Sequence, residues 1–222
     1  MTARVQYEVL KWSQIYDMLL RQATKICASG FRPGVIVGVS RGGWLPARVL
    51  SDLLENPDLA NVRAESYVGI NETINEPILT QSLSMAVAGK TVLVVDEVAD
   101  TGKSIKLVVD HIRELGATEV RTATLFFKSC CGLKPDYFEI ITDRWVVFPW
   151  ETKETLRLIY ESNKNSPKKV EEEIEEFSGR RMHPFQPPGR LPLPDEETGG
   201  GNQPDGGNDF VHAVRFRKEY GR

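Results

Sequence analysis

The sequence predicts an α/β fold with a mostly parallel, twisted sheet flanked by helices, and three observations support this prediction. Two apolar runs without polar alternation, GVIVGVS (34–40) and TVLVVDE (91–97), are typical of parallel strands covered on both faces. Each run precedes a glycine-containing turn and a stretch of helical apolar spacing. At 222 residues and 41% hydrophobic composition, the chain can bury one good core with some excess length.

The predicted elements alternate along the chain as such a sheet requires. Strands are predicted at 34–40, 91–97 and 119–128, and helices at 12–29, 43–54 and 104–115. Gly30 and Gly116 stand where the first and last of these helices would end.

Two segments fall outside this pattern. Residues 66–89 are polar and poor in core residues, so a mobile flap and an irregular hairpin remain equal alternatives. We expect residues 1–163 to form the domain and residues 164–222 to form a tail, with a short acidic helix at 168–177. Residues 184–208 contain six prolines and six glycines, which predicts a disordered linker.

Composition excludes several classes of function. Twenty-eight Lys and Arg against 31 Asp and Glu leave a net charge of −3, so no overall basic field favours nucleic acid. Neither a signal peptide nor a membrane-spanning apolar run is evident, so we expect a cytoplasmic protein. Cys27, Cys130 and Cys131 lack zinc-site spacing, and we expect them to be reduced and structural.

Three acids directly follow a buried strand in VLVVDEVADTGKS (92–104), namely Asp96, Glu97 and Asp100. A helix cap at a strand end would account for one acid, but three repel one another unless hydroxyls, amides or a cation compensate. The segment is not a P-loop, because Glu97 stands where that pattern needs a glycine. Asp96 and Glu97 can accept hydrogen bonds from vicinal hydroxyls, and amides at the start of the next helix suit a phosphate. The combination indicates a ribose 5-phosphate as ligand.

A second turn, Ser40-Arg41-Gly42-Gly43, follows the first buried strand. Its glycines let backbone amides approach an anion, and Arg41 adds a forked cation. Alone, such a turn could equally serve tight packing. Because sites in parallel sheets lie at the carboxyl ends of strands, the two turns together predict one anion-binding site.

These motifs resemble those of type I phosphoribosyltransferases. VLVVDEVADTGKS is similar to the family's fingerprint for phosphoribosyl diphosphate (PRPP), and VGVSRGGWLPARVL (37–50) to its pyrophosphate loop. RWVVFPWE (144–151) resembles the base-binding end of xanthine-guanine phosphoribosyltransferases. Glu97 departs mildly from the pattern, because the family's acid pair is often Asp-Asp. The resemblance covers roughly residues 10–160 and implies the fold of that family.

The resemblance implies a role for each matched residue. Asp96 and Glu97 would contact the ribose hydroxyls, and Asp100 would face the purine and relay a proton as N9 becomes the nucleophile. The remaining residues expected to bind PRPP, through its phosphate and pyrophosphate groups, are Ser40, Arg41, Gly42, Gly43, Thr101, Gly102, Lys103 and Ser104.

For the base, the resemblance implies that Lys128 donates to the purine O6, that Trp145 stacks on the ring and that Val146 reads its edge through backbone groups. As alternatives, Lys128 could be solvated and Trp145 could belong to the core. Mg²⁺ is implied as the bridge between pyrophosphate and ribose hydroxyls, with Asp96, Glu97 and, more weakly, Glu151 as protein ligands.

The function that follows is transfer of the 5-phosphoribosyl group from PRPP to N9 of guanine, xanthine or hypoxanthine in purine salvage, with release of pyrophosphate. A PRPP-sensing transcription regulator on the same fold is the alternative, although the sequence shows no appended helix-turn-helix. An orotate or uracil enzyme lacks support in RWVVFPWE. We expect a homodimer or homotetramer with PRPP and a purine base as partners, and neither nucleic acid nor a membrane.

Overall fold

The computed structural model describes residues 6–69 and 72–163, which fall in one compact unit of the chain. The predicted acidic helix and the proline- and glycine-rich tail lie outside the described residues and stay predictions. In chain order the elements are β1 (Tyr7–Val9), α1 (Trp12–Ala28), β2 (Val35–Ser40), α2 (Trp44–Leu53), β3 (Leu59–Gly69), β4 (Glu72–Gln81), β5 (Thr91–Ala99), α3 (Lys103–Glu114), β6 (Glu119–Phe127), β7 (Tyr137–Ile141), β8 (Trp145–Val147) and α4 (Thr152–Asn163).

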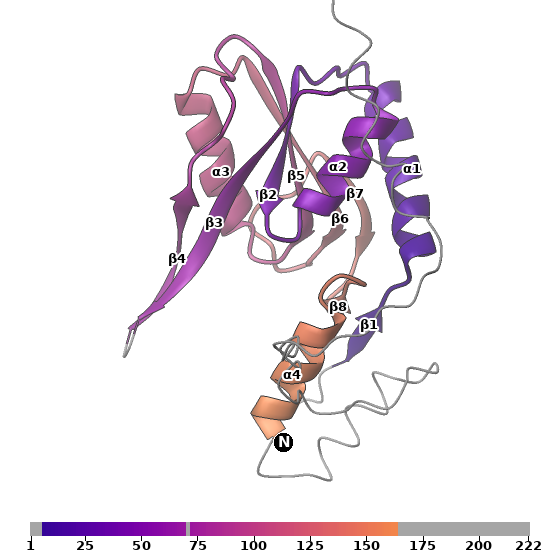
Figure 1. The fold of residues 1–222 in the computed structure, drawn as a ribbon, viewed down its shortest axis with the longest axis vertical. Coiled ribbons are helices and arrows are strands. Elements are labelled where there is room, and N and C mark those ends of the chain that lie inside the picture. Colours follow the sequence, from indigo (N-terminus) through magenta and orange to yellow (C-terminus); the bar gives the residue numbers. More distant parts are fainter. Residues whose placement is uncertain (1–5, 70–71, 164–222) are drawn as a thin grey trace, which may run out of the picture. The chain divides into compact units, whose positions relative to one another are not determined.

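Six strands form the main sheet, in the order β4-β3-β2-β5-β6-β7. All neighbours are parallel except β3 and β4, so the predicted mostly parallel α/β fold is confirmed. A second, two-stranded parallel sheet joins β1 to β8 (Figure 1). None of the helices between residues 6 and 163 is long and apolar enough to cross a membrane.

Helices cover both faces of the main sheet, which explains why its central strands read as continuous apolar runs. Within β2, Ile36 packs in one core cluster with Leu50 of α2, while Val35 and Val37 pack in the other with Val108 of α3. Helix α1 lies on the same face as α2, against β6 and β7 (Figure 1). The period of two along a strand thus supplies both cores from one short sequence.

The order of the strands reverses between β2 and β5. From β2 the chain crosses through α2 to β3 on one side, whereas from β5 it crosses through α3 to β6 on the other. The two strands are in parallel register, with Gly38 opposite Val95, so both end at the same edge of the sheet. Such a reversal opens a crevice outside the carboxyl ends of the strands, where α/β proteins bind ligands.

The segment that the sequence left open contains a strand hairpin. β3 and β4 pair antiparallel, with register shifts between Arg63 and Ala64 and between Ser66 and Val68. The hairpin alternative is therefore confirmed for the described part of residues 66–89. Its closure over a ligand stays a prediction.

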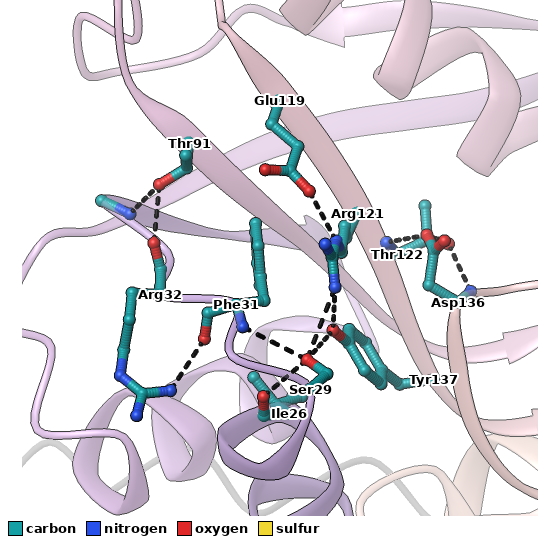
Figure 2. A network of polar contacts seen from close by, with 11 residues as sticks. Ile26, Ser29, Phe31, Arg32, Thr91, Glu119, Arg121, Thr122, Asp136 and Tyr137 are labelled. Atoms are coloured by element: carbon teal, nitrogen blue, oxygen red, sulfur yellow. Dashed lines mark hydrogen bonds and ion pairs between the residues drawn. The ribbon is translucent and has the colours of Figure 1, made fainter.

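A polar network braces the opposite edge of the sheet, at the amino-terminal ends of the strands (Figure 2). Arg121 donates hydrogen bonds to the Glu119 carboxylate at 2.7 Å and to the Tyr137 hydroxyl at 2.8 Å, and its guanidinium lies 4.5 Å from the centre of the Phe31 ring. These contacts tie β6 to β7 and to the segment before β2. They connect these elements at the amino-terminal ends of the strands, opposite the carboxyl ends where the site is predicted.

Candidate active site

The two predicted turns meet at the carboxyl ends of β2 and β5. A Cβ atom on Gly42 would stand 1.5 Å from Oε2 of Glu97, and one on Gly43 would stand 2.5 Å from the carbonyl oxygen of Val95. The glycine turn therefore lies directly against the acid pair, at a distance that a side chain would prevent. The Ser40–Arg41 peptide bond that leads into this turn is cis.

The acids Asp96 and Glu97 stand in an environment that disfavours their charge. Burial raises the pKa of Asp96 to about 7, even though one of its oxygens accepts a hydrogen bond from the Glu97 backbone at 2.9 Å. Burial, followed by the charges of Asp96 and Glu151, raises the pKa of Glu97 to about 8. Such an arrangement lowers the stability of the fold, and it is the kind that functional sites maintain.

Arg41 leaves the glycine turn towards α4. Its Nη2 donates to both carboxylate oxygens of Glu154, each at 2.8 Å, and this contact raises the pKa of the guanidinium. The Arg41 side chain is 70% exposed, so the ion pair is open to water and to competing anions. Arg41 therefore lies beside the glycine turn. Its guanidinium, which was predicted to bind pyrophosphate, is paired with the Glu154 carboxylate.

The predicted phosphate turn follows β5 and begins α3. Gly102 has φ +80°, and a Cβ there would stand 2.8 Å from the Cys131 sulfur, so glycine is needed for both conformation and space. At the start of α3 the backbone N–H of Lys103 donates to the Thr101 hydroxyl at 3.4 Å, and the positive end of the helix dipole lies at this turn. Lys103 pairs with Glu76 of β4 at 2.7 Å, which connects this turn to the hairpin.

The residues that complete the turn are placed as follows. Asp100 and Thr101 are exposed, and Ser104 is half-buried in the first turn of α3. The backbone N–H of Gly132 donates to the Thr101 carbonyl at 3.2 Å. The loop after β6 therefore contacts the turn through this backbone hydrogen bond, and the Asp100 side chain remains exposed.

The predicted base-binding residues lie at the ends of β6 and β8. The backbone N–H of Lys128 donates to the Ala99 carbonyl at 2.9 Å, and its Nζ donates to the carbonyl of Arg144. Lys128 therefore joins the end of β5 to the segment that enters β8. Trp145 is 53% exposed, so the alternative that it belongs to the core is wrong, whereas the Val146 side chain is buried. Among the described contacts, none joins Trp145 or Val146 to the acid pair.

The residues present fit a magnesium ion only with oxygens supplied by a ligand. No group of three or more ligating side chains close enough to hold a metal occurs within residues 6–69 and 72–163. Glu151 accepts a hydrogen bond from the Phe148 backbone at 3.2 Å, and burial raises its pKa. Mg²⁺ is commonly held by one or two carboxylates together with substrate and water oxygens. Asp96 and Glu97 would supply the carboxylates of such a site.

Two residues at the site were not singled out from the sequence. Trp150 donates from its indole Nε1 to Oε2 of Glu97 at 3.0 Å, and Glu154 holds Arg41. Trp150 lies inside the RWVVFPWE motif, but the sequence alone does not distinguish it from a tryptophan that packs in the core. Glu154 lies in a helical segment, where a glutamate is usually solvated. Only the path of the chain from β8 into α4 brings both back to the turns.

All three cysteines are free thiols, but Cys27 and Cys130 are exposed, so the expected structural role finds support only at Cys131. Cys131 lies beneath the phosphate turn, where burial raises the pKa of its thiol. This placement agrees with a packing role.

A mostly parallel sheet with a glycine turn and an acid pair at the reversal of its strand order defines an α/β protein of the doubly wound class. Comparison with known families narrows this class, because the phosphoribosyl transferase domain matches residues 6–155. The chain belongs to the phosphoribosyltransferase family, and the family predicted from its motifs is confirmed.

Individual relatives agree with this assignment. The chain is 32% identical over 151 residues to the xanthine-guanine phosphoribosyltransferase of Gluconobacter oxydans, covering 67% of this chain and 86% of that protein. The crystal structure of a purine phosphoribosyltransferase from Pyrococcus horikoshii matches with 34% identity and a TM-score of 0.59, over 65% of this chain and 93% of that one. The xanthine-guanine-hypoxanthine phosphoribosyltransferase of Helicobacter pylori shares the fold, with 21% identity and a TM-score of 0.59 over 68% of this chain and 97% of that one.

Proposed function

We propose that the protein transfers the 5-phosphoribosyl group of PRPP to N9 of a 6-oxopurine and releases pyrophosphate. The observation that carries the proposal is the contact between Gly42 and Glu97, because it joins an anion turn to diol acceptors in one site. The names of the relatives, which include xanthine-guanine enzymes, support a 6-oxopurine as the acceptor.

Substrate binding would use the groups that the fold brings together. The carboxylates of Asp96 and Glu97 would accept hydrogen bonds from the ribose 2- and 3-hydroxyls. Backbone amides from Asp100 to Ser104 would hold the 5-phosphate at the start of α3. Arg41 would exchange the carboxylate of Glu154 for the more highly charged pyrophosphate.

In the transfer step, the bond between C1 of the ribose and the pyrophosphate oxygen breaks, and the electron pair leaves with pyrophosphate. The N9 lone pair forms the new bond to C1, and the N9 proton passes to Asp100, which is exposed at the end of β5. Arg41 would stabilise the charge that develops on the leaving group. When bound, Mg²⁺ held by Asp96, Glu97 and substrate oxygens would supply further neutralisation of that charge.

The purine would lie between the end of β6 and the start of β8. Lys128, already directed to the Arg144 carbonyl, would donate to the purine O6, and the exposed Trp145 ring would stack on the base.

We further propose that the β3–β4 hairpin closes over PRPP, because Glu76 of β4 already contacts Lys103 in the phosphate turn.

The proposal is tested by incubating the protein with PRPP and Mg²⁺ and, separately, guanine, xanthine, hypoxanthine or adenine. We expect nucleoside 5-monophosphate and pyrophosphate in equal amounts with at least one 6-oxopurine, and little product with adenine. PRPP binding without release of its pyrophosphate in the presence of any of the four bases would favour a sensor instead. Product with adenine alone would overturn the assignment of the acceptor.

A further inference from the structure

Trp150 lies beside Glu97 of the acid pair and packs against two aromatic rings. Its ring stacks on Phe148, with centroids 4.9 Å apart and planes at 11°, and lies against Trp12 with centroids 5.5 Å apart and planes at 52°. Phe148 is itself 1% exposed, so the stack is anchored in the core. Aromatic neighbours of this kind fix the plane of the indole and therefore the direction of its N–H.

The indole N–H is directed at Glu97. Nε1 donates to Oε2 of Glu97 at 3.0 Å, and the same oxygen is the atom closest to a Cβ built on Gly42. A glutamate side chain has three rotatable bonds and loses more conformational freedom on ordering than a shorter acid. The indole hydrogen bond and the close Gly42 backbone favour one orientation of the carboxylate, which a side chain at position 42 would displace. Among the described contacts none uses Oε1, which is left to accept from a ligand.

We propose that Trp150 is a positioning residue of the transfer reaction, whose indole N–H fixes the Glu97 carboxylate in the orientation that receives a ribose hydroxyl of PRPP. This inference rests on the proposed function. It assigns Trp150 no contact with the reacting atoms, so its effect passes through Glu97. Trp150 also links the end of the base-binding motif to the ribose site, which neither turn does alone.

The variant Trp150→Phe tests the proposal, because it keeps an aromatic ring and removes the N–H donor. In the complex with PRPP, where the proposal has Glu97 act as an ionised acceptor, a hydrogen bond to a charged group is strong enough that we expect kcat/KM for PRPP to fall roughly ten- to hundredfold without it. The loss should appear mainly in the KM for PRPP, with the KM for the purine nearly unchanged. Trp12→Phe is the matched control, since Trp12 belongs to the same stack and makes none of the described contacts with Glu97; it should stay within about twofold of the wild type.

A double-mutant cycle separates positioning from packing. In the Glu97→Ala background, Trp150→Phe should have almost no further effect on kcat/KM, because the group it orients is absent. Additive losses in kcat/KM, or equal PRPP KM values for Trp150→Phe and Trp12→Phe, would overturn the inference. The proposed function would still stand if the wild type is active. Should Trp150→Phe fail to fold, Trp150→Tyr, which also keeps a ring and lacks the indole N–H, replaces it in the cycle.

A spectroscopic readout is independent of turnover. The indole N–H resonance of Trp150, assigned from its loss in the variant, should move upfield in ¹H–¹⁵N spectra when Glu97 becomes Ala. An unchanged resonance would contradict the contact itself. If the wild type were inactive with every purine while this resonance moved, the proposed reaction would fail and the contact would stand. Titration with PRPP and Mg²⁺ would then test the positioning role of Trp150, which requires that Trp150→Phe bind PRPP more weakly than Trp12→Phe does.

Discussion

Replacement of Glu97 by glutamine should stabilise the ligand-free protein at alkaline pH, because the folded state resists ionisation of this carboxylate. Its pKa rises from 4.5 to about 8, chiefly through burial. Between these pH values the unfolded chain has released the proton that the folded protein retains. The associated stability is therefore fully present below about pH 4.5 and is lost as the pH rises towards 8.

The size of the effect follows from the separation of the two pKa values. One pKa unit corresponds to about 1.4 kcal/mol, so the interval from 4.5 to about 8 sets a ceiling of about 5 kcal/mol. Glu97 is partly accessible to water, it shares its repulsion with Asp96, and glutamine gives the Trp150 N–H a weaker, neutral acceptor. We therefore expect Glu97→Gln to raise the free energy of unfolding by about 2–3 kcal/mol at pH 8.5 and by less than about 1 kcal/mol at pH 5.

Urea unfolding at the two pH values measures this gain. Glu139→Gln is the matched control, because the Glu139 carboxylate is paired with Arg21 at 3.0 Å and Lys25 at 2.8 Å. The same chemical change should there reduce stability at pH 8.5. A Glu97→Gln protein no more stable than the wild type at pH 8.5, with the control behaving as expected, would refute the argument that the acid pair is maintained at a cost to the fold.

Three further outcomes are expected at the site. Asp100→Asn should bind PRPP normally and lose roughly a hundredfold or more in turnover, since it cannot accept the N9 proton; turnover within about twofold of the wild type would exclude that role. Gly42→Ala should remove PRPP binding with little change in Tm, because its Cβ meets only a movable carboxylate, whereas Gly43→Ala should lower Tm because its Cβ meets backbone; calorimetry and thermal melting distinguish them, and equal effects would contradict the loop geometry. Glu154→Gln should bind pyrophosphate up to about fivefold more tightly in calorimetric titration, because Arg41 is released from an exposed ion pair; weaker binding would mean that the glutamate assists the anion.

The sequence predicted the central strands and helices well because local chemistry determines them. The apolar runs at 34–40 and 91–97 correspond to Val35–Ser40 and Thr91–Ala99, which are covered on both faces. Gly30 and Gly116 stand at the predicted helix ends with φ +76° and +89°. Elements defined by distant partners were less accessible, since β1 and β8 have only three residues each and exist by pairing with each other.

The sequence placed the two turns of the candidate site but not the residues that reach the site from distant parts of the chain. Its two turns follow directly from strand ends, so their residues could be placed at one edge before the structure was known. Trp150 and Glu154 could not, because their partners lie 53 and 113 residues away in the chain. Nothing local distinguishes an indole that orients a carboxylate from one that fills the core.

A crystal structure of the protein with PRPP and Mg²⁺ tests the central claim most directly, because it locates the ribose and both phosphate groups in one measurement. We predict ribose hydroxyls within hydrogen-bonding distance of Asp96 and Glu97, the 5-phosphate on the backbone amides of residues 101–104, and pyrophosphate beside Arg41 with the contact to Glu154 broken. PRPP bound away from the ends of β2 and β5, or a ribose whose hydroxyls contact neither acid, would contradict the account.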